Sequence, residues 1–346
     1  MGSAGCDGCD DGTGCGWVGS AAAQTVTVTY AQIPTSNKLW LTNGNAMAEL
    51  VGYASANLAA TGTPAASVTV KGPGGKDVAF DKDGNLWSFG PTTAEAMINR
   101  IPASAFASSG TKMADRAINL KGVGCVPPTS RMAFDAAGNL WVSSPCQKSV
   151  VRISAADLAA SGDVTPSVTL SNIDGVEGIA FDKGGNLWVG ANDLRRYDAA
   201  HLSASAATPD LTIHSEVMTA VGLTANGALF DKDGNLWSYD FGGNAFFKIT
   251  PSEQMGTGMK TVVVSIRITI GVTALLEGAA FDEGGGLWIT GSQGKFARLA
   301  PSQLGTSSGA GNPTVPQTII TSADIGSAAG MAFYPAPAGV PLYDAL

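Results

Sequence analysis

The chain has 346 residues, a net charge of −8 and a pI of about 4.7. This acidic balance argues against nucleic acid and against anionic membrane surfaces as electrostatic partners. No run of about eighteen or more apolar residues occurs, so we expect no transmembrane helix. The apolar content of 45% is ample for a globular core.

Residues 1–24 differ in kind from the rest. They are rich in Gly, Ala and Ser, hold Cys6, Cys9 and Cys15, and contain no apolar core of a signal peptide. The tetrapeptide ending at Cys6 is similar to the end of a bacterial lipoprotein signal but lacks its usual Leu. We therefore predict a flexible leader, with a lipid anchor on Cys6 as the alternative. No zinc-like spacing joins the three cysteines, which favours a disulfide in a secreted tail over a metal site.

A repeat organises the chain from residue 25 onward. Its nine-residue phrase is complete at 79–87, 133–141, 180–188, 229–237 and 280–288, always with Phe and Trp seven positions apart. Degenerate copies stand at 33–40 and 331–343. Successive Trp residues from Trp40 to Trp288 are 47, 54, 47, 49 and 51 positions apart. This period is typical of a four-stranded propeller blade.

Each phrase predicts a β-hairpin. Asp81 is placed to bind the following backbone amides, and Gly84 supplies the positive φ of a tight turn. The run from Asp81 to Asn85 is faintly similar to half of a calcium loop. The copy from Asp135 to Asn139 lacks the middle acid, which a turn tolerates and a metal site does not. We therefore interpret these segments as turns.

The remainder of each unit predicts a third strand, such as 150–153, a short helical turn, such as 250–253, and an outer strand, such as 167–170. We predict a single domain, 25–346, folded as a six-bladed β-propeller of four-stranded antiparallel blades. Segments 25–34 and 331–343 would meet where the ring closes. Seven blades, the last built from both termini, is the alternative, because seven phrases accompany only six pairs of third and fourth strands.

Two cysteines, Cys125 and Cys146, are predicted to lie close together in the fold. Cys125 lies just before an inner strand and Cys146 just after the next strand of the same blade. The loops that enter strand one and leave strand two lie at the same end of a blade. We expect either a Cys125–Cys146 disulfide or two separate buried thiols.

Polar residues stand where the inner strands begin. Four positions before each Phe are Lys76, Ser130, Glu177, Asn226, Glu277 and Ala329, with Asp77 and Arg131 one residue later. The loops after the second strands add Asn43, Asn45, Asn192, Asp193, Asp240 and Asn244. All should ring one mouth of the central channel. The predicted ligand-binding set is Lys76, Asp77, Arg131, Glu177, Asn192, Asn226, Asp240 and Glu277. The alternative is a solvated funnel in which Lys76 pairs with Asp77 and Arg131 with Glu177.

No catalytic residue is evident. His201 and His214 fall on the predicted outer rim, and the chain has no nucleophile elbow, Walker loop or dinucleotide fingerprint.

Residues 178–189 resemble the repeat of the NHL and streptogramin-lyase-like propellers. The resemblance implies the propeller fold and little about activity, because propellers host many functions. Streptogramin lyases carry catalytic histidines at the channel mouth, where this chain has none. Gluconolactonase-like propellers bind calcium through a Glu-Gly at an inner strand. Glu177-Gly178 and Glu277-Gly278 are similar to that motif, and Asn192 and Asp240 would complete such a site.

These observations predict a non-catalytic, exported bacterial propeller that acts as a ligand-binding or surface scaffold module. Its partner would be a protein or a small polar ligand, with no cofactor unless calcium binds. It would lie outside the cell or at its surface, with the periplasm as the alternative. Two other functions stay open: a metal-dependent hydrolase or lyase at the funnel, and a self-associating subunit of an extracellular surface assembly.

Overall fold

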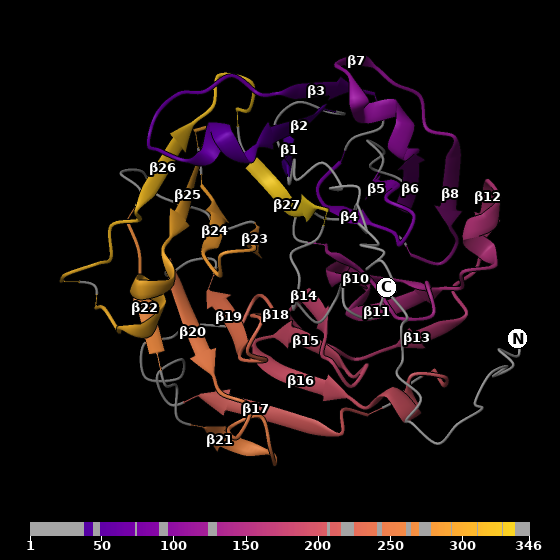
Figure 1. Cartoon of the computed structure of the whole chain (residues 1–346). Helices are drawn as coiled ribbons and strands as arrows, with labels where there is room; N and C mark the ends of the chain where they lie inside the picture. Colours follow the sequence, from indigo (N-terminus) through magenta and orange to yellow (C-terminus); the bar gives the residue numbers. More distant parts are fainter. Residues whose placement is uncertain are drawn as a thin grey trace, which may run out of the picture. The chain divides into compact units, whose positions relative to one another are not determined.

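The structure is a computed structural model. It describes residues 38–43, 49–72, 75–89, 96–123, 130–205, 208–215, 225–240, 244–260, 264–269, 278–291, 293–309, 311–326 and 328–335. These residues form six sheets of four or five strands around a central axis (Figure 1). The six-bladed propeller is therefore confirmed, and the seven-bladed alternative is wrong. The predicted leader and the segment 25–34 lie outside the described residues.

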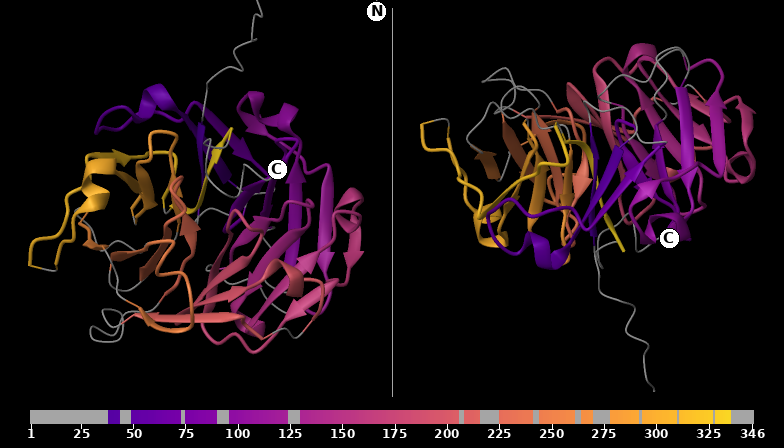
Figure 2. Two further views of the ribbon diagram at one scale, coloured as in Figure 1. Left: turned by 60° about the horizontal axis from the view of Figure 1, so that its bottom comes forward. Right: turned by 90° about the horizontal axis from the view of Figure 1, so that it is seen from above.

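Each blade runs from an inner strand at the axis to an outer strand at the rim (Figures 1 and 2). Blade 1 consists of β27 (Ala328–Tyr334), β1 (Lys38–Asn43), β2 (Glu49–Ala54) and β3 (Val68–Lys71). Blade 2 consists of β4 (Val78–Phe80), β5 (Leu86–Phe89), β6 (Ala96–Ile101) and β8 (Arg116–Leu120). Blade 3 consists of β9 (Met132–Phe134), β10 (Leu140–Ser144), β11 (Ser149–Ile153) and β13 (Val168–Leu170). Blade 4 consists of β14 (Val176–Phe181), β15 (Leu187–Ala191), β16 (Asp193–Tyr197) and β17 (Leu211–Ser215); blade 5 of β18 (Leu229–Phe230), β19 (Leu236–Asp240), β20 (Ala245–Ile249) and β22 (Val264–Arg267); blade 6 of β23 (Ala279–Phe281), β24 (Leu287–Thr290), β25 (Lys295–Leu299) and β26 (Thr318–Thr321).

Blade 1 closes the ring with strands from distant parts of the chain. The C-terminal β27 is its innermost strand and pairs antiparallel with β1, so that Trp40 lies opposite Ala332 and Leu39 opposite Phe333. The two degenerate phrases are therefore the halves of one hairpin, split between the ends of the repeat. This explains why seven phrases build only six blades.

The turn between the first two strands of a blade is built on one aspartate. Oδ1 of Asp81 accepts the backbone N–H groups of Asp83 and Asn85 at 3.0 and 2.9 Å, and Oδ2 accepts the indole N–H of Trp87 at 2.9 Å. The Asn85 amide donates to both oxygens, and Gly84 has a φ of 78°. Asp135, Asp182 and Asp231 repeat this pattern. Because N–H donors occupy the carboxylate oxygens, the predicted turn is confirmed.

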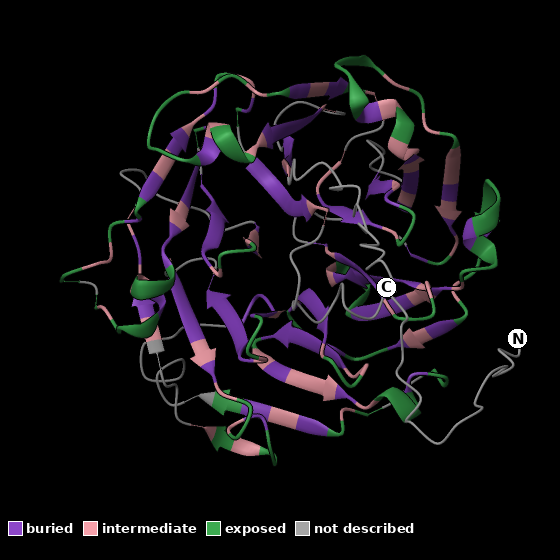
Figure 3. Ribbon diagram, in the orientation of Figure 1, coloured by how far each residue is buried: buried purple, intermediate pink, exposed green. Residues whose placement is uncertain are grey.

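The hydrophobic core consists of six clusters, each between neighbouring blades. In five interfaces the Trp of one blade contacts the Phe of the next, with ring centroids 5.9 to 6.4 Å apart. At the sixth, between blades 6 and 1, Trp288 instead contacts Phe296 of its own blade, at 5.9 Å. Buried residues follow the strands and exposed ones the outer connections (Figure 3). Sheets sandwiched in this way explain strands that are apolar on both faces.

A belt of connecting segments covers the outer edges. Three short strands, β7 (Gly110–Thr111), β12 (Gly162–Val164) and β21 (Gly258–Lys260), pair in parallel with the outer strands of the preceding blades. A Ser or Thr hydroxyl of each connection also accepts a backbone N–H from the neighbouring outer strand, through Thr61, Ser109, Ser161, Ser205, Thr257 and Ser307. We call these six residues the outer belt. It protects strand edges that would otherwise be open to pairing with other chains.

Short 3-10 helices join the third and fourth strands, as predicted for the helical turns. They include η1 (Ser55–Leu58), η2 (Ala103–Ala107), η4 (Asp157–Ala159), η5 (Ala199–His201) and η6 (Pro301–Gly305); η3 (Pro145–Gln147) instead follows strand two of blade 3. Within the part of the chain that the structure describes, no helix is long and apolar enough to span a membrane.

Candidate functional site

A small cavity lies on the axis, between the first strands of all six blades. Its volume is about 110 Å³, and residues from every blade line it, from Asp77 in blade 2 to Met331 in blade 1. Polar side chains enter it from the ends of the strands that the sequence analysis singled out. Hydroxyl groups on the second strands position these ends. Thr42, Ser143 and Thr290 each accept a backbone N–H of the inner strand at 2.7 Å.

Arg131 and Asp77 form the centre of the site. Asp77 is 5% exposed, and its Oδ2 accepts the backbone N–H of Met132, in the next blade, at 2.8 Å. Burial raises the pKa of Asp77 to about 6, although the Arg131 guanidinium and the Met132 N–H lower it. Arg131 Nη1 donates to the Ser130 carbonyl at 3.0 Å. Burial lowers the pKa of Arg131, but Tyr239, Asp77 and Glu177 outweigh burial and raise it overall.

Glu177 extends the cluster toward blade 5. It lies near Arg131 and Asp240, and its carboxylate accepts a hydrogen bond from Asn226. Burial raises the pKa of Glu177 to about 7; Arg131 and Asn226 lower it, and the like charge of Asp240 raises it further. Asp240 and Asn226 are themselves buried, at 5% and 8% exposure. The raised pKa values of Asp77 and Glu177 therefore place the titration of both carboxyl groups close to neutral pH.

Tyr239 is the residue that the sequence analysis missed. It follows Trp237 by two positions in β19, where blades 1, 3 and 6 carry the hydroxyl residues described above. Its hydroxyl hydrogen-bonds Arg131, and burial raises its pKa. The ring occupies space left by Gly227, since a Cβ there would lie 1.9 Å from the Tyr239 ring. The sequence did contain a signal for this contact: an aromatic residue, Tyr239, two positions after Trp237, and a glycine, Gly227, on the preceding inner segment.

The structure brings together Asp77, Arg131, Glu177, Asn226 and Asp240 of the predicted set. Asn192 is exposed, adopts a φ of 57° and lies against Gly175. Lys76 is half-buried, and its carbonyl accepts the Thr42 hydroxyl at 3.4 Å. Glu277 lies outside the described residues, as does Asn45.

Two of the remaining mouth residues, Asn43 and Asp193, have local partners. Asn43 donates to Glu49 at 3.2 Å, and Asp193 pairs with Arg195 at 2.8 Å. Ser130 is buried, and no hydrogen-bond partner of its Oγ lies among the described residues; the same holds for Oδ1 of Asn244. Ala329 is buried beside Gly278, whose Cβ, if present, would lie 2.4 Å from the Ala329 carbonyl oxygen.

The described donors do not fit calcium. Glu177, Asp240 and Asn226 offer the oxygen ligands that calcium takes. However, the guanidinium of Arg131 acts directly on Glu177, and this fixed cation opposes a second one. No group of three or more His, Cys, Asp or Glu residues in the described part of the chain could hold a metal ion. The predicted calcium ligand Glu277 lies outside that part, so the Glu177–Glu277 pair stays a prediction.

The two histidines lie in η5 and β17, outside the axial cavity. His201, in η5, is exposed and its Nδ1 lies 2.7 Å from Asp210 Oδ1; His214 is an exposed residue of β17. Both belong to the outer rim, as predicted. Cys146 lies in η3, and Cys125 falls outside the described residues, so their pairing stays a prediction. Cys6, the predicted lipid anchor, also lies outside them.

Comparisons with known proteins agree on the fold. The sequence matches no protein-family profile and no curated protein. A putative 6-phosphogluconolactonase from Bacteroides fragilis is 12% identical, with 79% of this chain and 81% of that one covered and a TM-score of 0.53. A streptogramin B lyase is 13% identical over 65% of each chain, with a TM-score of 0.45. A luciferin-regenerating enzyme is 16% identical over 74% of this chain and 80% of that one, with a TM-score of 0.46. At these identities the similarity shows the propeller fold alone.

Proposed function

We propose that this protein is a non-catalytic binding propeller that holds a small polar group of a ligand in its central channel. The observation that carries this proposal is the Arg131 guanidinium held among Asp77, Glu177 and Tyr239. Asp77 and Glu177 both act on this one guanidinium, and Asp240 lies near Glu177. This surplus of acceptors favours a ligand end that donates hydrogen bonds, such as an ammonium or hydroxyl group.

The size of the cavity limits what enters it. A volume of about 110 Å³ is the share of roughly three to four water molecules in the liquid. Ligand pockets for whole small molecules are larger, about 300 to 1,000 Å³. The channel would therefore hold the end of a ligand, and the rest would lie above the mouth.

The test is calorimetric titration with primary and quaternary ammonium probes, putrescine and choline, and with calcium. An ammonium group that binds beside Glu177 should lower its pKa and release protons near pH 7. The measured heat should then depend on the ionisation enthalpy of the buffer. Glu177→Gln should abolish the proton release and weaken binding at least tenfold. The matched control is Asp174→Asn, because Asp174 is an exposed carboxylate that pairs with Lys148 outside the channel. Equal binding by the Glu177 variant, or no binding of either probe, would contradict the proposal.

A second candidate is a hydrolase or lyase at the same site. The pKa values of Glu177 and Asp77, about 7 and about 6, suit general acid–base catalysis at neutral pH. Turnover of lactones or esters, lost in Glu177→Gln and kept in Asp174→Asn, would favour this candidate over the binding module. Parallel assays with added calcium would separate a metal-dependent enzyme from acid–base chemistry by the side chains alone.

Self-assembly is the third function to test. The outer belt occupies the strand edges, so edge-to-edge addition at the rim is disfavoured. An extracellular assembly would have to use the faces of the ring, and light scattering over a range of concentrations would detect it. Export itself is supported by the predicted Cys125–Cys146 pair. Mass spectrometry of alkylated, non-reduced protein would show two free thiols if that pair does not form.

A further inference from the structure

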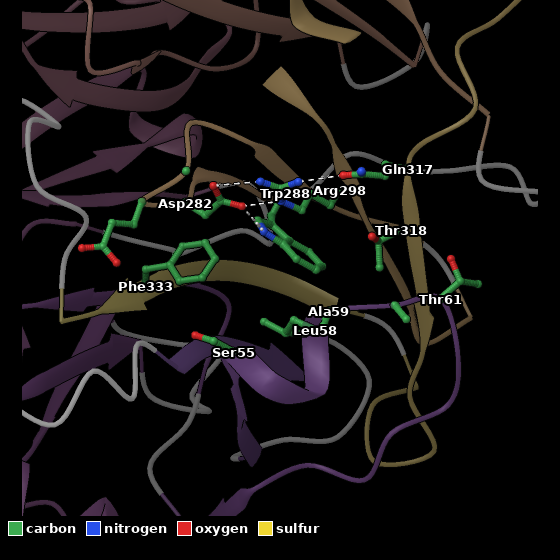
Figure 4. A pocket seen from close by; sticks show the side chains of 13 residues that line it. Ser55, Leu58, Ala59, Thr61, Asp282, Trp288, Arg298, Gln317, Thr318 and Phe333 are labelled. Atoms are coloured by element: carbon green, nitrogen blue, oxygen red, sulfur yellow. Dashed lines mark hydrogen bonds and ion pairs between the residues drawn. The ribbon is translucent and has the colours of Figure 1, made fainter. Parts of the chain in front are cut away.

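A second cavity opens between blades 6 and 1 (Figure 4). Its lining includes Asp282, Glu283 and Gly284 of the blade 6 turn, so it lies at the opposite end of the inner strands from the channel mouth. Its volume is about 680 Å³, within the range of pockets that bind whole small molecules. Its apolar walls include Leu58 of η1, Trp288 of β24 and Phe333 of β27. A second wall carries polar side chains.

Other blades carry a basic side chain at the equivalent position, and the equivalent cavity between blades 5 and 6 is smaller, about 240 Å³. In blades 2 to 6 the residue paired with the repeated Trp on the third strand is Arg100, Arg152, Arg196, Lys248 or Arg298. The first four hold their cations 5.6 to 6.0 Å from the centre of the Trp ring. Arg152 also reaches the next blade, where Nη1 donates to the Leu202 carbonyl at 3.2 Å.

Arg298 instead folds back onto the turn of its own blade. Its Nε lies 2.5 Å from Asp282 Oδ2 and its Nη2 3.2 Å from Oδ1. The room comes from Gly286, because the other four turns carry Asn at this position. A Cβ on Gly286 would lie 2.3 Å from Arg298 Nη2. Gly286 therefore leaves the space in which the Arg298 guanidinium binds Asp282.

The neighbouring blade does not fill the resulting space. In the described residues, the ring contact of Trp288 is with Phe296 of its own blade, not with Phe333 of blade 1. Residues 55–62 of η1 and its connection are identical to 155–162 of blade 3 at five of eight positions. The difference from the other interfaces thus lies on the blade 6 side, in Gly286 and Arg298.

The polar wall defines the chemistry of an occupant. Asp282 and Arg298 neutralise each other, and Arg298 Nη1 donates to Gln317 at 2.8 Å (Figure 4). Glu283 is a further, exposed acidic residue of the lining. We propose that this cavity binds a neutral, hydroxyl-rich ligand, a short saccharide, with one apolar face against Leu58 and the aromatic residues. Planar amide, carboxylate and guanidinium groups provide donors and acceptors for its hydroxyls.

The test is ligand-observed NMR and calorimetry with maltose and N-acetylglucosamine as probes. In the Gly286→Asn variant the new Asn side chain should hydrogen-bond Asp282, as Asn does in the other turns. The Arg298 guanidinium would then be displaced from Asp282 and would extend into the cavity toward blade 1. Saccharide affinity should then fall at least tenfold. Ala59→Leu should narrow the cavity from η1 and have a similar effect. Its matched control is Ala159→Leu, at the equivalent position of η4, which should bind like the wild type.

Two results would overturn the inference. One is no binding of either saccharide at about 10 mM, ten times a Kd of about 1 mM. The other is binding that persists in the Ala59→Leu variant, whose folding is checked by circular dichroism. Because the channel residues take no part here, Glu177→Gln should leave saccharide binding unchanged.

Discussion

The two ends of the inner strands follow opposite rules. At the turn end five blades repeat one aspartate, which binds the indole N–H of the same blade at 2.9 Å each time. At the mouth end the residue four positions before Phe varies among the blades: Lys76, Ser130, Glu177, Asn226, Glu277 and Ala329. A repeated residue meets a need that every blade shares, whereas a single ligand on the axis needs different groups from different blades. The repeated end thus specifies the fold, and the varied end is where function is expected.

The carboxylates at the two ends differ in the same way. Those of the turns receive several N–H donors each, and their hydrogen bonds stabilise the hairpins. Those at the mouth are buried, which raises the pKa of Asp77 to about 6 and that of Glu177 to about 7. Ionised carboxylates at the mouth therefore destabilise the fold. We therefore predict that removing a turn aspartate lowers the stability of the fold, and that replacing a mouth carboxylate by a neutral side chain raises it.

The largest effect is expected from deletion of residues 328–346. Loss of β27 removes the innermost strand of blade 1. It uncovers the neighbours of Met331 and Phe333 in blades 1 and 6 and those of Ala332 in blades 1 and 2. We expect a loss of more than about 4 kcal/mol, on the scale of truncating a buried aromatic residue and its surroundings, with aggregation as the visible result. Thermal unfolding by circular dichroism and size-exclusion chromatography would measure it.

Deletion of residues 1–20 is the control, since that segment has no strand pattern. It should change the melting temperature by less than about 3 °C. A C-terminal deletion that melts cooperatively at the full-length temperature would contradict the ring closure through β27.

The next effect is expected at the turn of blade 3. Asp135→Ala removes the acceptor of the Trp141 indole N–H and of two backbone N–H groups. We expect a loss of about 3 kcal/mol in urea unfolding, because a buried donor is left without its charged acceptor. Asp135→Asn retains one oxygen acceptor and should lose less. Exposed Asp174→Asn serves as the control, and a change below about 0.5 kcal/mol in Asp135→Ala would disprove the structural role of the turn.

At the mouth we expect the substitution of a carboxylate to raise the stability of the fold, in contrast to the turn. The folded pKa of Glu177 is raised from 4.5 to about 7. Its contribution to stability is therefore greatest below the unfolded value and is lost as the pH rises through about 7. Asp77 acts likewise between 3.8 and about 6. We expect Glu177→Gln to be about 1 to 3 kcal/mol more stable than the wild type at about pH 8.

Urea unfolding measured from about pH 4 to about pH 8 would test the sign. The wild type should lose stability over this range, and the Glu177→Gln profile should be flatter. A variant that is less stable than the wild type at the upper end would show that the carboxylate stabilises the fold, contrary to the argument from burial.

The smallest effect is expected at the rim. Ser161 belongs to the outer belt, and its hydroxyl accepts the Ala117 backbone N–H at 3.0 Å in an exposed position. Ser161→Ala should lower stability by about 1 kcal/mol or less and speed hydrogen exchange of the Ala117 amide. Unchanged exchange of that amide would show that the belt does not protect the edge.

The features that recur along the chain were predictable. A Phe and a Trp seven positions apart, with Asp and Gly between them, identified the hairpin, the blade and the period. The positions of Arg131, Glu177 and Asp77 at one mouth followed from the same alignment of repeats. Tyr239 was missed because it departs from the repeat only on the second strand. The outer belt was missed because single Ser and Thr residues in Gly-rich connections carry no periodic pattern.

The sequence by itself determined the architecture, because five blades encode the same local hairpin and five of the six interfaces the same Trp–Phe contact. Only the tertiary structure decided which charges meet. Arg131, Glu177 and Asp240 come from three blades, and their mutual distances depend on how the blades pack around the axis. The cavity beside Arg298 also required the folded ring, since a glycine at position 286 matters only where a cation on the next strand can move into its space. Repetition is a local property that a sequence displays, whereas the fit between unlike blades arises when the ring closes.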